Sequence, residues 1–316
     1  MNKIIFGDCR ETMRHLAADG VKVQTCVTSP PYFGLRDYGH EGQIGLEQTP
    51  EEYIAAMIEV FRCVRDVLAD DGTLWLNLGD TYAVGKQLLG IPWRVALALQ
   101  SDGWILRQDI IWHKPNPMPE SVRDRCTKAH EYIFLLSKSG RYYFDQEAIS
   151  EPIAAASIAR LSQPSLANQK GSDRVPGKTN GTMKAVIRSS GNKERKQRPG
   201  SPDSHYGKQA GSVPWEGSTR NKRSVWTVST KPYKGAHFAT FPLDLIEPCI
   251  LAGSRGNDIV LDPFMGSGTT AAGAIKNGRQ YIGCELNADY EHLQQERIRL
   301  ANESLPRHQD LFEGAA

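Results

Sequence analysis

The chain has 316 residues, 40% of them hydrophobic, which is enough for one large domain or for one domain with an insertion. We predict no membrane span, because no run of about 18 apolar residues occurs. The start, Met1–Asp8, has the pattern of a strand and turn instead of a signal peptide. The six cysteines are scattered without a C-x-x-C pair, which argues against a structural zinc site and a disulfide framework. A reducing, cytosolic setting is the simple interpretation.

The net charge of +2 is unevenly distributed along the chain. Residues 151–223 contain fourteen Lys or Arg and five Asp or Glu, an excess of +9, which leaves −7 for the rest. The same stretch is rich in Gly, Ser, Pro, Asn and Gln and has little helical or strand periodicity. It is therefore either a flexible solvated insert or a segment that binds phosphates.

The apolar pattern predicts alternating strands and helices. We expect strands at 3–6, 21–27, 73–78, 104–112, 130–136, 224–228, 259–262 and 280–284, with 141–144 as a hairpin partner. We expect helices at 10–18, 50–68 (with a Thr49 cap), 91–100, 242–252, 270–277 and 288–301. This alternation predicts an α/β fold, a mostly parallel sheet with helices on both faces and ligands at the carboxyl ends of its strands.

The run Thr28-Ser29-Pro30-Pro31-Tyr32 follows an apolar strand. Its prolines fix φ and cannot continue the strand, so the run predicts a rigid turn with outward carbonyls. With the Ser29 hydroxyl and the Tyr32 ring beside it, the turn can accept hydrogen bonds from an exocyclic amine and stack on a flipped base. The alternative is a structural Pro-Pro turn.

The second informative segment, Ile259–Thr270, predicts a strand, a tight glycine turn and the start of a helix. Glu285 ends the next strand, where α/β nucleotide sites hold ribose hydroxyls. The third glycine of the dinucleotide pattern is missing, so the NAD fingerprint fails. An ordinary strand–helix turn is the alternative.

Val27–Tyr32 and Asp262–Thr270 resemble the catalytic motif and the S-adenosylmethionine loop of the amino-group DNA methyltransferases, which act on cytosine N4 or adenine N6. Their order, with the glycine loop last, is similar to the permuted beta group. The motifs and their connecting segments account for most of the chain except its middle. The resemblance implies a Rossmann-like methyltransferase sheet, S-adenosylmethionine, duplex DNA, a prokaryotic or phage source, a cytoplasmic location and no metal. A separate restriction endonuclease is a candidate partner.

The resemblance also implies three groups of site residues. The catalytic group is Ser29, Pro30, Pro31 and Tyr32. The cofactor-binding group is Asp8, His237, Thr240, Phe241, Asp262, Phe264, Gly266, Ser267, Gly268, Thr269, Thr270 and Glu285. The DNA-binding group is Lys193, Arg195, Lys196 and Arg198. The segment Asp109–Pro119 is similar to one that lines the target base, and Asn77 and Asp80 are weaker candidates with loop capping as the alternative. For Asp8 the alternative is a helix cap, and for His237 it is ordinary polar surface.

These motifs favour direct in-line methyl transfer after base flipping, without a metal or a covalent intermediate. Serine before Pro-Pro is more typical of the cytosine-N4 enzymes, so we predict N4 and keep adenine N6 as the alternative. Cytosine-C5 chemistry would need a cysteine nucleophile, whereas Cys249 lies in a predicted helix and is interpreted as buried. An RNA or protein methyltransferase would not need the basic insert, and a non-catalytic DNA-binding module would not need the glycine loop.

We therefore divide the chain into four segments. Residues 1–150 are the catalytic part of the methyltransferase domain, and 224–303 are the cofactor-binding part of the same domain. Residues 151–223 form the basic target-recognition insert, and 304–316 form a polar tail.

Overall fold

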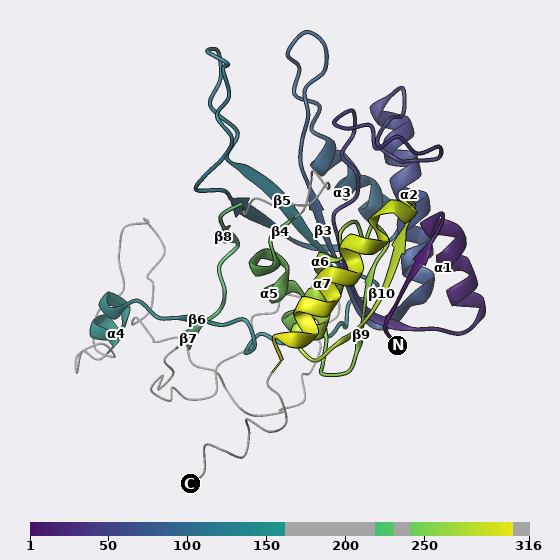
Figure 1. Ribbon diagram of the computed structural model, residues 1–316. Coiled ribbons are helices and arrows are strands. Elements are labelled where there is room, and N and C mark those ends of the chain that lie inside the picture. Colours follow the sequence, from purple (N-terminus) through teal and green to yellow (C-terminus); the bar gives the residue numbers. More distant parts are fainter. Residues whose placement is uncertain (162–218, 231–240, 306–316) are drawn as a thin grey trace, which may run out of the picture. The chain divides into compact units, whose positions relative to one another are not determined.

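A computed structural model describes residues 1–161, 219–230 and 241–305 (Figure 1). The chain divides into two compact units, one formed by Met1–Ile149 with Arg223–Ala316 and the other by Ser150–Lys222. The first unit contains all the predicted catalytic residues.

The first unit is built on one eight-stranded sheet in the order β1-β10-β9-β2-β3-β5-β4-β8. All neighbours are parallel except β5, which is antiparallel to both β3 and β4, so the predicted mostly parallel sheet is confirmed. The strands are β1 (Lys3–Phe6), β2 (Val23–Thr28), β3 (Leu68–Leu78), β4 (Ile105–His113), β5 (His130–Ser137), β8 (Val225–Thr227), β9 (Ile259–Asp262) and β10 (Gln280–Glu285).

Helices cover both faces of this sheet, as predicted (Figure 1). They are α1 (Cys9–Ala18), α2 (Pro50–Val67), α3 (Ile91–Ser101), α5 (Leu243–Gly253), α6 (Thr269–Lys276) and α7 (Glu291–Glu303), the last preceded by the short 3-10 helix η2 (Ala288–Tyr290). Because side chains alternate along a strand, Cys26 and Leu76 pack with α1, α2 and α3, whereas Val27 and Trp75 pack with α5 and α6. The sheet thus separates two apolar cores.

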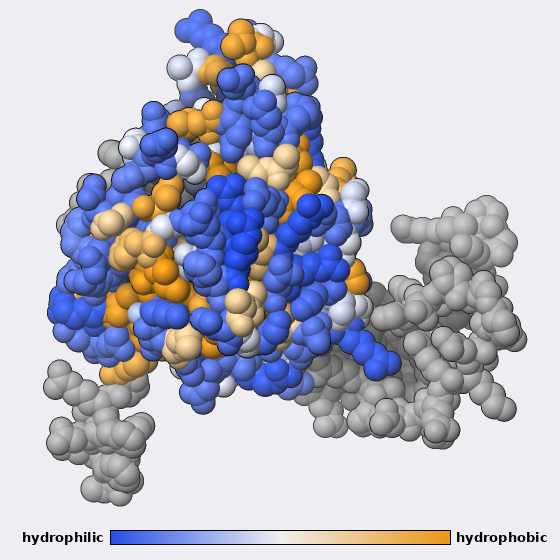
Figure 2. Space-filling model, turned by 90° about the vertical axis from the view of Figure 1, so that its right-hand side faces the viewer, coloured by the Kyte–Doolittle hydropathy of each residue, from blue (hydrophilic) through white to orange (hydrophobic). Residues whose placement is uncertain are grey.

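The helix α2 begins where the sequence predicted. The Thr49 side chain accepts from the Glu52 backbone N–H, and the Glu52 carboxylate accepts from the Thr49 N–H, forming a capping box. The helix leads directly into β3, which begins at Leu68 and not at Thr73, because Leu68 pairs with Val23 of β2. Hydrophilic side chains cover most of the face shown in Figure 2, on the side of α1 and α2. This agrees with apolar helix faces turned toward the sheet.

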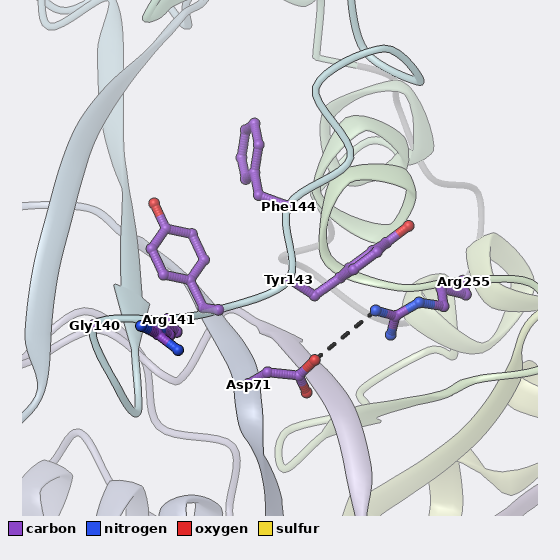
Figure 3. A pocket seen from close by; sticks show the side chains of 7 residues that line it. Asp71, Gly140, Arg141, Tyr143, Phe144 and Arg255 are labelled. Atoms are coloured by element: carbon purple, nitrogen blue, oxygen red, sulfur yellow. Dashed lines mark ion pairs between the residues drawn. The ribbon is translucent and has the colours of Figure 1, made fainter. Parts of the chain in front are cut away.

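The predicted hairpin strand at 141–144 is wrong, since these residues form no strand. Instead, Tyr142 packs on Arg107 and Phe144 stacks on Trp75, while the Arg255 guanidinium carbon lies 3.8 Å from the centroid of the Tyr143 ring. Together with Asp71 and Arg255, residues 141–144 line an open hollow (Figure 3). It lies beside the amino-terminal part of β3 and the loop that follows β5, at the edge of the sheet opposite the carboxyl end of β2.

The second unit contains the strands β6 (Glu151–Pro152) and β7 (Thr219–Arg220), which pair antiparallel, and the helix α4 (Ala155–Leu161). An ion pair between Arg220 and Glu151, 3.5 Å apart, joins the two strands. The helix α4 was not expected from the sequence. Among the described residues, no helix is both long and apolar enough to cross a membrane.

Candidate active site

The two motifs, far apart in the sequence, lie side by side in the sheet. Strand β2 leads into the Ser29 turn, β9 leads into the glycine loop, and the two strands are parallel neighbours through Thr25–Val260 and Cys26–Leu261. The Thr28 hydroxyl donates to Asp262 Oδ1 at 2.6 Å, across a separation of 234 residues. Since the carboxyl ends of parallel strands meet at one edge, the turn and the loop start from the same place.

Asp262 fastens the glycine loop to the catalytic strand. Its Oδ1 also accepts from the Phe264 N–H at 3.0 Å, and its Oδ2 accepts from the Thr270 hydroxyl at 2.6 Å. Burial raises the pKa of this carboxyl to about 6, although the three hydrogen bonds favour the charged form. Both oxygens are thus engaged within the protein, and the contact with a cofactor predicted for Asp262 stays a prediction.

The glycine loop turns tightly between β9 and α6. Gly266 and Gly268 have φ values of +52° and +86°, in the left-handed region that favours glycine. The Gly266 N–H donates to Glu285 Oε2 at 2.7 Å, and the Asn287 N–H donates to Glu285 Oε1 at 2.9 Å. Burial raises the pKa of Glu285 to about 7. The carboxylate predicted to hold ribose hydroxyls therefore lies against the loop.

Ser267 gives a direct sign that this loop fits a ligand. Its Oγ is buried and has no hydrogen-bond partner within the described part of the chain. A hydroxyl buried without a partner costs about 1–3 kcal/mol. A polar ligand group at the loop would remove that cost, as the cofactor predicted from the sequence would do.

Asp8, Phe241, Phe264, Thr269 and Thr270 are the other predicted cofactor residues in the described ranges. Asp8 caps α1 by accepting from the Arg10 N–H at 2.7 Å, and the Arg10 guanidinium hydrogen-bonded to it lowers its pKa. Asp8 therefore caps α1, a role compatible with binding a ligand, and its contact with the cofactor stays a prediction. Phe264 packs against the core on the α1–α3 face, Phe241 packs against the α5–α6 face, and Thr269 and Thr270 open α6.

Three elements hold the catalytic turn. The Tyr53 hydroxyl of α2 donates to the Pro31 carbonyl at 2.9 Å. The Tyr32 hydroxyl donates to Glu131 Oε2 of β5 at 2.7 Å, and the Asn77 amide of β3 donates to the Tyr32 hydroxyl at 2.7 Å. Asn77 and Glu131 meet because Leu78 pairs with Tyr132 in the antiparallel register.

Sequence reasoning ranked these supports too low or missed them. Asn77 was only a weaker candidate, and Glu131 was not singled out, whereas Lys114, which pairs with Glu131, belongs to the segment Asp109–Pro119 that was predicted to line the target base. The signal that could have identified Glu131 is its position as a carboxylate at the second residue of the apolar strand β5, at the edge of the sheet where the Ser29 turn lies. Asp80, the other weak candidate, has the capping role instead, since its carboxylate accepts from the Gly90 and Ile91 N–H groups at the start of α3.

Some predicted residues lie outside the described ranges: His237, Thr240, Lys193, Arg195, Lys196 and Arg198. In the described part of the chain, no group of three or more His, Cys, Asp or Glu could hold a metal ion. Cys249 is buried in α5, as interpreted, with its Sγ 3.8 Å from the Leu245 carbonyl oxygen.

A proline turn and a glycine loop at one edge of such a sheet are the arrangement expected of an amino-group methyltransferase. The family model described as DNA methylase (N6_N4_Mtase) matches residues 23–296, and the chain belongs to this family of N4 and N6 DNA methylases. It is 41% identical to the Type II methyltransferase M.SmaI of Serratia marcescens, over 94% of this chain and 90% of that protein. It is 39% identical to M.Cfr9I of Citrobacter freundii, over 93% and 86%.

Solved structures show the same fold. The PvuII DNA methyltransferase (cytosine-N4-specific) superposes with a TM-score of 0.61 at 17% identity, covering 97% of this chain and 87% of that one. The M1.HpyAVI–SAM complex gives a TM-score of 0.51 at 19% identity, covering 94% and 100%. The Rossmann-like methyltransferase fold predicted from the sequence is confirmed.

Proposed function

We propose that this chain transfers a methyl group from S-adenosylmethionine to the exocyclic N4 of cytosine in duplex DNA, after the base has been flipped out of the stack. The observation that carries the proposal is the shared edge of the Ser29 turn and the glycine loop, joined by the Thr28–Asp262 hydrogen bond. Membership in the DNA methylase family supports the reaction class and the DNA substrate.

S-adenosylmethionine supplies an electrophilic methyl group when bound. The glycine loop brings its backbone close to this ligand, Glu285 accepts from the ribose hydroxyls, and Ser267 Oγ bonds to a polar group of the ligand. These assignments use side chains that lie along one loop and the neighbouring strand end.

The amine is a poor nucleophile because its lone pair is delocalised into the ring. Ser29 Oγ and the Pro30 carbonyl accept hydrogen bonds from its two N–H groups, which returns electron density to nitrogen. Tyr32 stacks on the base. Holding the amine in line with the methyl group supplies several kcal/mol through positioning alone. The new N–C bond would replace the S–C bond of the sulfonium, the neutral thioether would leave, and the amine would release one proton to water.

The choice of cytosine rests on Ser29, the residue that precedes Pro-Pro. The test is to methylate unmodified DNA with the purified protein, digest it to nucleosides and identify the product by mass. We expect N4-methylcytosine. N6-methyladenine alone would mean that the chemistry holds but the base is adenine. No methylated nucleoside, with cofactor binding retained, would reject the enzymatic proposal.

A calorimetric titration separates the enzyme from a non-catalytic DNA-binding module. S-adenosylmethionine should bind the wild-type protein and should not bind Gly266→Arg, because a long side chain at this left-handed position fills the loop. Equal DNA binding by both proteins is the control for folding. Absence of cofactor binding by the wild type would favour the module.

The remaining parts of the proposal concern setting and partners. We propose that residues 151–223 contact DNA phosphates and contribute to target recognition, because of their excess of basic residues. We also propose a cytoplasmic enzyme that works beside a separate restriction endonuclease. The relatives named Type II methyltransferases support that setting.

A further inference from the structure

The Tyr32 hydroxyl occupies the centre of a hydrogen-bond chain at the catalytic turn. It donates to Glu131 Oε2 at 2.7 Å, and the Ser29 hydroxyl donates to it at 3.3 Å. The Asn77 amide nitrogen lies 2.7 Å from Tyr32 Oη, 3.2 Å from Ser29 Oγ and 3.1 Å from Glu131 Oε2. Four side chains from three elements thus meet at one point.

Glu131 is fixed as an acceptor in this cluster. Its other oxygen, Oε1, is paired with the Lys114 ammonium group, which also lies 4.3 Å from the centroid of the Trp112 ring. The side chains of Lys114 and Glu131 are only 19% and 15% exposed. Both carboxylate oxygens of Glu131 face donors, Oε1 the Lys114 ammonium and Oε2 the Asn77 amide, so the Tyr32 hydroxyl donates its proton to Oε2.

The direction of these hydrogen bonds then determines whether the Ser29 hydroxyl donates to the target amine or accepts from it. Since Tyr32 gives its proton to Glu131, Tyr32 Oη is left as an acceptor and takes the proton of Ser29. The Ser29 oxygen has two lone pairs, and the Asn77 amide uses one of them. The second lone pair is left to accept a hydrogen bond from the target amine.

The ring of Tyr32 is held as firmly as its hydroxyl. A Cβ at Gly79 would lie 2.5 Å from Cε2 of the ring, so the ring lies directly on the backbone at the end of β3. Burial, together with the nearby charge of Glu131, raises the pKa of Tyr32 well above its usual value, so the phenol keeps the proton that it donates.

We propose that Glu131 is a positioning residue which sets the direction of the chain Ser29–Tyr32–Glu131 and so makes Ser29 an acceptor toward the exocyclic amine. Asn77 completes this hydrogen-bond chain, and the ion pair with Lys114 holds the Glu131 carboxylate in place. This inference rests on the proposed function, but it holds for an amine on either cytosine or adenine.

The test is a double-mutant cycle on the single-turnover rate of DNA methylation at saturating cofactor. Glu131→Gln introduces an amide N–H that can donate to Tyr32 and so reverse the direction of the hydrogen bonds. Tyr32→Phe removes the hydroxyl that links Ser29 to Glu131 but keeps the aromatic ring. We expect each variant to lower the rate about tenfold or more, the loss of one useful hydrogen bond in the transition state. Both substitutions act on the same lone pair of Ser29, so their effects should not multiply. The rate of the double variant should lie within about threefold of the rate of the slower single variant.

The controls separate this role from a structural one. The dissociation constant for S-adenosylmethionine should stay unchanged in each variant, and Glu131→Asp, which still only accepts, should recover part of the rate lost in Glu131→Gln. The matched control is Glu296→Gln, which removes the exposed ion pair with Arg299 on α7 and should keep the wild-type rate.

Three results would overturn the inference: a wild-type rate for Glu131→Gln, multiplicative effects in the double variant, or no recovery with aspartate. If Tyr32→Phe does not fold, the methylation rates of Glu131→Gln and Glu131→Asp still test the inference. Failure of the proposed function is distinct, since it would appear as the wrong nucleoside, or none, with the wild-type protein.

Discussion

At the scale of single residues, Gly79 shows how closely the catalytic turn is packed. A Cβ there would meet the Tyr32 ring at 2.5 Å, nearer than real side-chain carbons approach. We predict that Gly79→Ala displaces the ring and lowers the methylation rate at least tenfold. Cofactor affinity, measured by calorimetry, should not change. Gly256→Ala is the control because nothing lies within 4 Å of a Cβ there. Equal rates for both variants would contradict the packing argument.

Glu285 makes a second prediction at this scale, on pH. Burial raises its pKa to about 7, so below that pH the carboxyl is largely protonated and is a poorer acceptor for ribose hydroxyls. We expect the affinity for S-adenosylmethionine to increase about tenfold from pH 6 to pH 8 and to level off above pH 8. Calorimetry at these pH values checks this. The Glu285→Gln variant should lose the part of the pH dependence that comes from this group.

The same shift affects stability in the opposite sense. Between about pH 4.5 and 7 the folded protein holds a proton at Glu285 that the unfolded chain has released. The contribution of this group to the free energy of unfolding therefore falls as the pH rises through that range and is constant above it. Urea unfolding at pH 5 and pH 7.5 should show a larger decrease for the wild type than for Glu285→Gln.

Residue identities allowed part of the site to be predicted. Ser29, Tyr32, Gly266 and Glu285 belong to local motifs whose chemistry is visible over a few positions. Glu131 was missed because its role depends on the antiparallel register of β5 against β3, which brings it to Asn77. No local pattern contains that pairing.

At the scale of elements, the Thr28–Asp262–Thr270 cluster joins β2, β9 and α6. We predict that Thr28→Val lowers the free energy of unfolding by about 1–3 kcal/mol, because a buried carboxylate loses a hydrogen bond that valine cannot replace. Urea denaturation monitored by circular dichroism measures this. Thr127→Val, at an exposed position, should change it by less than about 0.5 kcal/mol. A similar loss in both variants would mean that the cluster does not join these elements.

Helices and strands with strong periodicity were predicted closely, and the failures have physical causes. The helix α2 has apolar spacing, a proline at its start and a capping box, all local. The stretch 141–144 has strand-like aromatic residues, but its rings pack on Arg107, Arg255 and Trp75, which lie far away in the sequence. Strand propensity alone does not reveal such partners.

At the scale of the whole molecule, the uneven charge predicts how DNA binding responds to salt. Neutralising Lys193, Arg195, Lys196 and Arg198 together should weaken DNA binding. It should also make the plot of log affinity against log salt shallower by up to about 3–4, roughly 0.9 for each lost phosphate contact. Fluorescence anisotropy at several salt concentrations measures the slope.

The matched control neutralises four exposed basic residues of the first unit, Lys3, Lys22, Lys276 and Arg299. It should leave the slope nearly unchanged, and cofactor affinity should be the same in both variants. An unchanged slope in the first variant would remove the role proposed for residues 151–223.

The pairing of β2 with β9 has a consequence during synthesis of the chain. The ribosome makes Thr28 234 residues before its partner Asp262. At about 5–20 residues per second, that interval is roughly 10–50 seconds. During this time one edge of the central strand β2, five of whose six residues are buried in the folded protein, has no neighbour to pair with, and unpaired strand edges promote aggregation. The nascent polypeptide therefore carries an aggregation-prone strand edge until β9 has been made.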